Sequence, residues 1–120
     1  MRDTLQPGLT NEGRYTVTKD MSAPHLPRVV LATPTMIGLI EGVCLLATKP
    51  HLDDNETTVG AHVCVSHQAP ALEGEEIVIR CVLTKVEKRR LTFDVTVDTA
   101  NARISEGTHQ RGVVSLDRMR

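Results

Sequence analysis

Glu41 is the side chain of this 120-residue sequence whose surroundings most clearly point to chemistry. From Met36 to Ala47, all residues except Glu41 are apolar or glycine. A carboxylate among apolar side chains is costly unless it is paired, hydrogen-bonded or neutralised. Burial also raises the pKa of a carboxyl group, which suits a general base or a nucleophile. The pattern leaves open a purely structural acid that is paired with a local partner.

Two further side chains could move a proton or attack an electrophile. His67 continues the apolar face of the alternating stretch 59–65, and an imidazole exchanges protons near neutral pH. A histidine on such a face is also often a satisfied core residue. Thr33 stands directly before Pro34, and this order predicts a helix N-cap followed by a proline in the first turn. A threonine hydroxyl can also attack or orient water.

The elements that position these residues follow from the hydrophobic pattern. A long apolar helix is expected from Thr33, and Pro50 marks its end. Gly38 and Gly42 lie four residues apart, which predicts close packing of one helix face under a sheet. Residues 1–12 are polar and are expected to form a loose lead. Strands are expected over residues 13–20, 57–67, 76–87, 91–98 and 103–116.

This order of elements predicts the fold class. One strand, one long helix and four strands joined by short turns indicate an α+β domain with an antiparallel sheet. We expect a single domain over residues 1–120, in which a five-stranded sheet curls round the helix, the hotdog arrangement. Such a small sheet leaves an exposed edge, and pairing with a second copy would cover it. A homodimer is therefore expected, with a dimer of dimers left open.

Composition narrows the classes of partner. The net charge of −1 and the near absence of aromatic residues argue against a nucleic-acid partner. The apolar helix is too short to span a bilayer, and no signal peptide opens the chain. Three cysteines without a CxxC motif suit neither a disulfide framework nor a zinc site, and each is expected to be a buried thiol. We expect a soluble cytoplasmic protein without a metal.

Several spaced motifs resemble one known family. In chain order they are TPTMIGLIEGVC, VGAHVCVSHQAPALEGEEI, EKRRLTF and SEGTHQR. Together they resemble the hotdog-fold thioesterases related to fluoroacetyl-CoA thioesterase, from about Val30 to Leu116. The 26 positions between Glu41 and His67 match the family pattern. The resemblance implies a homodimer, an acyl-CoA substrate and hydrolysis of its thioester bond, with no cofactor other than the coenzyme A of the substrate.

The resemblance also implies roles for particular residues. Thr33, Glu41 and His67 correspond to the catalytic residues of the family. Gly60 corresponds to a glycine that supports recognition of the acyl group, although a β-bulge or a close-packing site would also explain it. Arg111 corresponds to the arginine of the GTHxR motif. His109 shares its strand face, so both are expected to bind substrate, with CoA phosphate or a dimer contact as candidates.

One departure from the family concerns the segment before the helix. In the fluoroacetyl-CoA enzyme this lid carries phenylalanine, whereas Pro24–Arg28 contains no aromatic residue. The expected substrate is therefore a short-chain or small substituted acyl-CoA. A non-catalytic module that binds acyl-CoA or a small acid is the alternative function. A hotdog hydratase is less well supported, because no Asp is followed five residues later by His within a segment that also bears glycine and proline.

Overall fold

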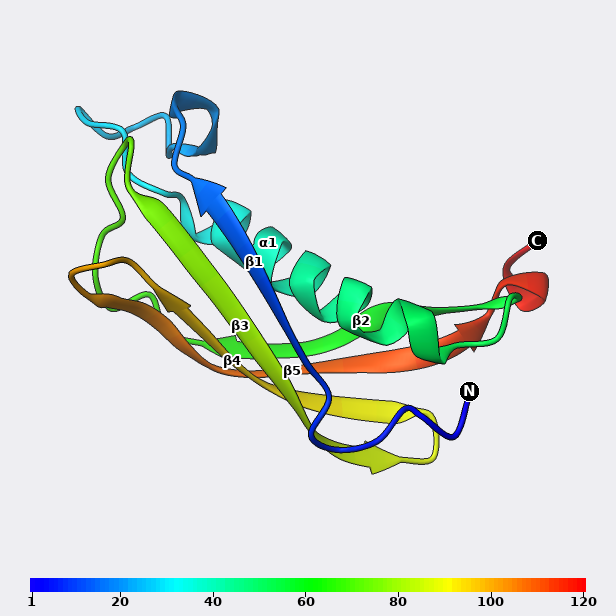
Figure 1. The fold of residues 1–120 in the computed structure, drawn as a ribbon. Coiled ribbons are helices and arrows are strands. Elements are labelled where there is room, and N and C mark those ends of the chain that lie inside the picture. The colour runs from blue at the N-terminus through cyan, green and yellow to red at the C-terminus, as the bar shows by residue number, and fades with distance from the viewer.

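The computed structural model describes residues 1–120 as one sheet with one long helix (Figure 1). The strands pair antiparallel in the order β1-β3-β4-β5-β2, and α1 lies across one face of the curled sheet. The elements are β1 (Thr10–Thr16), η1 (Lys19–Met21), α1 (Thr33–Thr48), η2 (Lys49–His51), β2 (Glu56–Val65), β3 (Glu76–Glu87), β4 (Arg90–Asp98), β5 (Arg103–Ser115) and η3 (Leu116–Met119). The expected five strands and single helix are confirmed.

The core lies between α1 and the central strands. Buried helix positions recur at intervals of three or four residues, as in Met36, Ile40 and Val43. Strand β4 buries every second side chain, as its alternating pattern predicts, and β3 does the same from Ile77 to Leu83. A single cluster of 20 buried apolar residues results. This cluster fixes α1 against the sheet and thereby sets the position of Glu41.

The opposite side of α1 is not covered by the chain's own sheet. Leu46 is 55% exposed on this side. A Cβ added at Gly38 or at Gly42 would meet nothing within 4 Å. The expected close packing of these two glycines under the sheet is therefore wrong within the chain. The hydrophobic pattern predicts an apolar helix, but it does not show that the sheet of one chain covers only one side of that helix.

The N-terminal residues are held by the sheet and do not form a loose lead. Leu5 is 2% exposed within the core. The backbone N–H of Gly8 donates to the carbonyl of Leu83, and the N–H of Leu83 donates to the carbonyl of Leu9. Strand β1 accordingly begins at Thr10, before the expected residue 13. Because the segment is mostly polar, its composition did not predict that Leu5 is buried or that the backbone of the segment forms hydrogen bonds with β3.

The start of α1 differs from the expected cap. Ala32 is the N-cap, Thr33 is already helical, and no side chain caps the first turn. The expectation that Thr33 caps the helix is wrong, because its hydroxyl is engaged elsewhere. The other end agrees with expectation, since α1 ends at Thr48 and the chain passes through Pro50 in a 3-10 turn.

A β-bulge in β2 changes which side chains point toward the helix. Gly60 pairs with Arg111 and His62 with Gln110, so Ala61 is an extra residue without a partner of its own. Because a shift of one residue turns a strand over, Thr58 is buried before the bulge while Val59 is 40% exposed. The single apolar face expected over residues 59–65 is therefore wrong in its first half.

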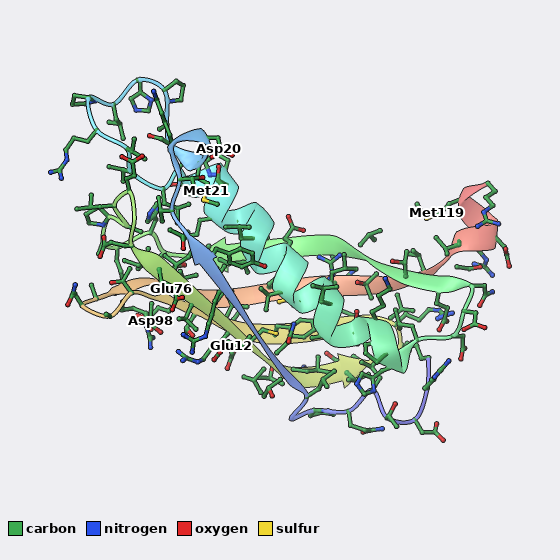
Figure 2. All side chains as sticks on the ribbon, turned by 45° about the horizontal axis from the view of Figure 1, so that its top comes forward. Glu12, Asp20, Met21, Glu76, Asp98 and Met119 are labelled. Carbon is green, nitrogen blue, oxygen red and sulfur yellow. The ribbon has the colours of Figure 1, made fainter.

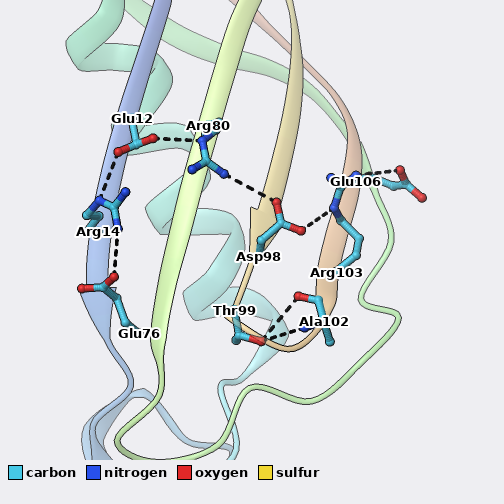
Figure 3. A network of polar contacts seen from close by, with 9 residues as sticks. All are labelled: Glu12, Arg14, Glu76, Arg80, Asp98, Thr99, Ala102, Arg103 and Glu106. Atoms are coloured by element: carbon cyan, nitrogen blue, oxygen red, sulfur yellow. Dashed lines mark hydrogen bonds and ion pairs between the residues drawn. The ribbon is translucent and has the colours of Figure 1, made fainter.

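The face of the sheet opposite α1 carries a chain of ion pairs (Figure 3). Arg80 donates to Glu12 and lies near Asp98, and Arg103 pairs with the same aspartate. Figure 2 shows Met119 at the opposite end of the molecule from Asp20 and Met21. No helix of the structure combines the length and the apolarity that crossing a membrane requires.

The three cysteines are free thiols in two different settings. Cys44 and Cys81 are buried between α1 and β3, as expected. Cys64 is exposed on β2, so the expectation of burial is wrong for this residue. Its place after the bulge, on an edge strand, explains the exposure. No group of three or more His, Cys, Asp or Glu side chains is arranged to hold a metal ion.

Candidate functional site

Thr33 and His67 meet at the N-terminal end of α1. The Thr33 Oγ1 lies 2.7 Å from the His67 Nδ1, which is a hydrogen bond between two side chains 34 residues apart. His67 is fixed by its neighbours, because the backbone N–H groups of Ser66 and Gln68 both donate to carbonyls of β5. Burial lowers the pKa of His67 from its ordinary value. A neutral imidazole beside a hydroxyl can accept its proton.

This pair opens onto a surface hollow of about 320 Å³. The hollow is lined by Val30, Thr33, His67, Gln68, Ala69 and Pro70. Apolar walls and one reactive polar pair suit a small acyl group whose carbonyl faces the hydroxyl. The first turn of α1 adds backbone N–H groups at Thr33 and Thr35 that have no intrahelical acceptor, since the first helical bond runs from Met36 to Ala32. Such donors can stabilise a developing oxyanion.

Glu41 belongs to a second cluster, on the part of α1 that faces β2 and β5. The Arg111 Nη1 lies 3.4 Å from the Glu41 Oε1, and the His109 Nε2 lies 3.8 Å from the same oxygen. The Glu41 side chain is 38% exposed, so this carboxylate is paired but not sealed in the core. It is accessible to a substrate while a cation stabilises its charge.

Arg111 is anchored mainly by a residue that sequence reasoning missed. Its Nε donates to the Thr58 Oγ1 at 2.8 Å, and its Nη2 donates to the Thr58 carbonyl at 3.0 Å. Burial lowers the pKa of Arg111, although the nearby Glu41 opposes this shift. Alternation placed Thr58 on the outward face, and only the bulge, which the sequence pattern does not reveal, turns it inward.

Gly60 lies directly against the Glu41 carboxylate. A Cβ added at Gly60 would lie 2.3 Å from the Glu41 Oε1. Both readings that the sequence left open, the bulge and the close approach, therefore apply at this position. Any larger residue here would displace the carboxylate.

The structure separates the three candidate catalytic residues into two groups within one chain. Thr33 and His67 are in contact, whereas Glu41 contacts Arg111 and lies close to His109. At 1.5 Å per helical residue, Glu41 lies about 12 Å beyond Thr33 along the axis of α1. Gly60 of β2 lies against Glu41, and His67 follows two residues after the end of β2, so both groups lie beside this edge strand.

His109 is enclosed and cannot meet a substrate directly. It is 0% exposed, and each of its ring nitrogens has a partner within the chain. Arg111 is 5% exposed. The geometry therefore supports an indirect role for His109 rather than the expected direct contact with substrate.

Solved structures of remote sequence identify the fold as a hotdog fold. A thioesterase superfamily member from Thermus thermophilus has a TM-score of 0.91 at 22% identity, covering 99% of this chain and 90% of that chain. A hot-dog-like protein from Thermanaerovibrio acidaminovorans has a TM-score of 0.87 at 19% identity, covering 94% and 86%. One helix on a curled five-stranded antiparallel sheet is thus the hotdog architecture.

Sequence comparison gives the family. The model of the fluoroacetyl-CoA-specific thioesterase family matches residues 12–117, so the chain belongs to this family. Fluoroacetyl-CoA thioesterase from Streptantibioticus cattleyicolor is 36% identical over 89 residues, which cover 74% of this chain. The same alignment spans 64% of that relative's length. A solved fluoroacetyl-CoA thioesterase has a TM-score of 0.91 at 29% identity, covering 98% of this chain and 93% of that chain.

Proposed function

We propose that the protein is a thioester hydrolase that converts a short-chain or small substituted acyl-CoA into the free acid and CoA. The observation that carries the proposal is the hydrogen bond between Thr33 and His67 at the open end of α1. Membership of a thioesterase family supports the same reaction. A variant of the related fluoroacetyl-CoA thioesterase has been solved with fluoroacetate and CoA, which supports a CoA thioester as the substrate class.

The proposed reaction consumes one water molecule, either in the attack itself or in the hydrolysis of an acyl-enzyme. An oxygen nucleophile attacks the thioester carbonyl carbon, a C–O bond forms, and the C–S bond then breaks to release the CoA sulfur. If water attacks, His67 takes its proton and passes it to the leaving sulfur, and the free acid forms directly. If the Thr33 hydroxyl attacks, the same proton transfer leaves an acyl ester on Thr33, whereas attack by the Glu41 carboxylate releases the sulfur as a thiolate and leaves an anhydride. Water then attacks the carbonyl carbon of that acyl-enzyme and gives up a proton to His67, which releases the free acid and restores the side chain. The backbone N–H groups of Thr33 and Thr35 stabilise the oxyanion. No cofactor other than the substrate's own coenzyme A takes part, so the rate is expected to be the same in a metal chelator.

The nucleophile is the Thr33 hydroxyl, the Glu41 carboxylate or water, and substitutions separate these routes. Thr33→Ser keeps a hydroxyl, whereas Thr33→Ala removes it together with the partner of His67. If both variants remain active, the hydroxyl is not the nucleophile. Glu41→Gln keeps the size of the side chain but removes the charge that faces Arg111. Inactivity of this variant alone would assign the central role to the carboxylate.

The proposed substrate class rests on the absence of aromatic side chains from the hollow. The sequence contains one Tyr, one Phe and no Trp. Phe93 is 0% exposed within the core, and Tyr15 lies on β1 beside Gly13. No aromatic ring can therefore select for a fluorinated acyl group at Thr33 and His67. We expect acetyl-CoA, propionyl-CoA and fluoroacetyl-CoA to be hydrolysed with kcat/KM values within about tenfold of one another, since small changes in an apolar pocket discriminate weakly.

The proposed assembly is a homodimer that pairs through β2, in the cytoplasm. The other edge strand, β1, carries Glu12 and Arg14, which discourage pairing. Strand β2 instead presents Val59 at 40% exposure beside Gly60 and Ala61. Because Glu41 lies against Gly60 of β2 and His67 follows two residues after the end of this strand, a partner strand paired with β2 would lie beside the site. The three free thiols fit a reducing compartment.

Release of CoA from a panel of acyl-CoA thioesters tests the proposed function. The exposed Cys64 would itself react with a thiol dye, so CoA is measured by chromatography. Turnover of at least one short-chain substrate is expected. The absence of CoA release by folded protein from every member of the panel would overturn the proposal.

The alternative is a non-catalytic module that binds acyl-CoA. The observation that favours it is the separation of Glu41 from Thr33 and His67 within one chain. Saturable binding of acyl-CoA without turnover, with affinity unchanged in Glu41→Ala, would establish this alternative. Turnover that Glu41→Ala abolishes would exclude it.

A further inference from the structure

The tautomer of His109 is fixed by its surroundings. Its Nδ1 lies 2.8 Å from the carbonyl oxygen of His62, which can only accept a hydrogen bond, so Nδ1 carries the proton. Its Nε2 lies 3.1 Å from the Arg111 Nη1, which can only donate, so Nε2 is the acceptor. His109 is therefore a neutral imidazole. Burial and the charge of Arg111 both lower its pKa, in agreement with this state.

This imidazole controls how Arg111 meets Glu41. The Arg111 Nη1 lies closer to the His109 Nε2, at 3.1 Å, than to the Glu41 Oε1, at 3.4 Å. The remaining guanidinium contacts go to Thr58. Arg111 is thus prevented from forming a tight two-bond pair with the carboxylate, which is the arrangement that an arginine otherwise favours. The cation stabilises the charge of Glu41 and leaves its oxygens available.

The other hydrogen bond of His109, from Nδ1 to the His62 carbonyl, holds the backbone of β2 at the bulge. The carbonyl of His62 belongs to the residue after the extra residue Ala61, so the bond from His109 fixes β2 where its register changes. This register places Gly60 against Glu41 and turns Thr58 toward Arg111. One buried side chain therefore connects the bulge to the guanidinium.

We propose that His109 is a positioning residue of the thioesterase site, which holds Arg111 at a distance from which it contacts one oxygen of the Glu41 carboxylate and leaves the other available to the reaction. The proposal rests on the proposed function, because it assigns the held carboxylate to that reaction. His109 itself touches no substrate, since it has no exposed surface. Four groups set its environment: Arg111 on β5, Glu41 on α1, and the carbonyl and side chain of His62 on β2.

Two substitutions separate the two bonds of His109. His109→Gln places an amide oxygen near the position of Nε2 and keeps an acceptor for Arg111. His109→Asn places an amide N–H near the position of Nδ1 and keeps the donor to His62, but leaves Arg111 without its acceptor. Both variants bury one amide in place of the ring, so each controls for the loss of the imidazole.

Steady-state kinetics give the first readout. In His109→Asn, kcat is expected to fall roughly 100-fold, because Arg111 is free to move onto Glu41, while KM stays within about threefold. In His109→Gln, kcat is expected to stay within about tenfold of the wild-type value. Equal losses in the two variants that track their folded fractions, or full activity of His109→Asn, would overturn the proposal.

Side-chain ¹⁵N spectra give a readout that does not need turnover. Wild-type His109 is expected to show a protonated Nδ1 and a bare Nε2 at neutral pH, and the Arg111 guanidinium is expected to rotate slowly in the wild type and in His109→Gln. Faster rotation in His109→Asn supports the proposal. The opposite tautomer, or identical Arg111 signals in all three proteins, overturns it. If the wild type releases no CoA, the proposed function fails, and these spectra still decide whether His109 positions Arg111.

Discussion

At the scale of single residues, the Glu41 carboxylate on α1 is paired with an arginine from the distant strand β5. Arg111 is 70 residues away, and its guanidinium reaches the Glu41 carboxylate at 3.4 Å. That Glu41 needs a partner could be predicted from the sequence, because a carboxylate between apolar residues must be compensated. The role of Thr58 could not be predicted, because the alternating pattern places this threonine on the outward face. Only the bulge turns its side chain toward Arg111.

The two histidines with lowered pKa give the protein a predictable response to acid. Burial lowers the pKa of both His67 and His109 below the ordinary value of 6.5. The unfolded chain therefore binds protons first as the pH falls through about 6.5, and their joint contribution to the free energy of unfolding decreases below that pH. Chemical unfolding between pH 8 and pH 5 is expected to show a shallower pH dependence in His109→Gln than in the wild type. An identical pH dependence would contradict a neutral, buried His109.

At the scale of elements, the bulge in β2 accounts for most of the difference between the expected and observed site. The alternating pattern predicts the strand but cannot reveal that Ala61 is an extra residue, because the sequence continues as an ordinary strand pattern through the bulge. The helix could be predicted from its long apolar run between Pro34 and Pro50, and β3 and β4 from their runs of β-branched and other apolar residues on either side of a charged turn. The sequence also could not show that Thr33 binds His67 instead of capping α1, because both roles use the same hydroxyl.

Substitutions at two glycines, Gly60 on β2 and Gly38 on α1, test the close approach of β2 to Glu41. Gly60→Ala is expected to reduce kcat by more than tenfold, as its Cβ would lie 2.3 Å from the Glu41 Oε1 and the carboxylate must move away. The free energy of unfolding should fall by no more than about 1 kcal/mol, because the atom that must move is the end of a flexible side chain. Gly38→Ala is the matched control. Its Cβ would meet nothing within 4 Å, so the variant should be about 0.5–1 kcal/mol more stable and fully active. Normal activity of Gly60→Ala would contradict the proposed site.

At the scale of the whole molecule, the two edges and the two faces of the sheet have different characters. The outer face carries a network of ion pairs, shown in Figure 3, that connects charged side chains of β1, β3, β4 and β5. Such pairs contribute at most about 1 kcal/mol each and keep the face hydrated, so this face does not favour a second layer of subunits. Strand β2 is the edge that a second copy would extend.

The proposed homodimer can be tested at the exposed edge strand β2. The wild type is expected to have twice the 13.2 kDa chain mass by light scattering. Val59→Lys, at a position 40% exposed on β2, should produce a monomer with little activity, because a charge on the edge opposes pairing. Met119→Lys changes a residue that is 63% exposed in η3, beyond the end of β5, and should leave both mass and activity unchanged. An active monomeric Val59→Lys would show that the site is complete within one chain.

The most direct test of the proposed thioesterase is the effect of His67→Ala on CoA release from the best short-chain acyl-CoA, with Gln68→Ala as the control. Both residues line the same hollow, but only His67 bonds to the Thr33 hydroxyl. Loss of the proton acceptor is expected to lower kcat by about 10²- to 10⁴-fold, whereas Gln68→Ala should remain within about twofold of the wild type. A His67→Ala protein that is folded and hydrolyses the thioester at the wild-type rate would contradict the account.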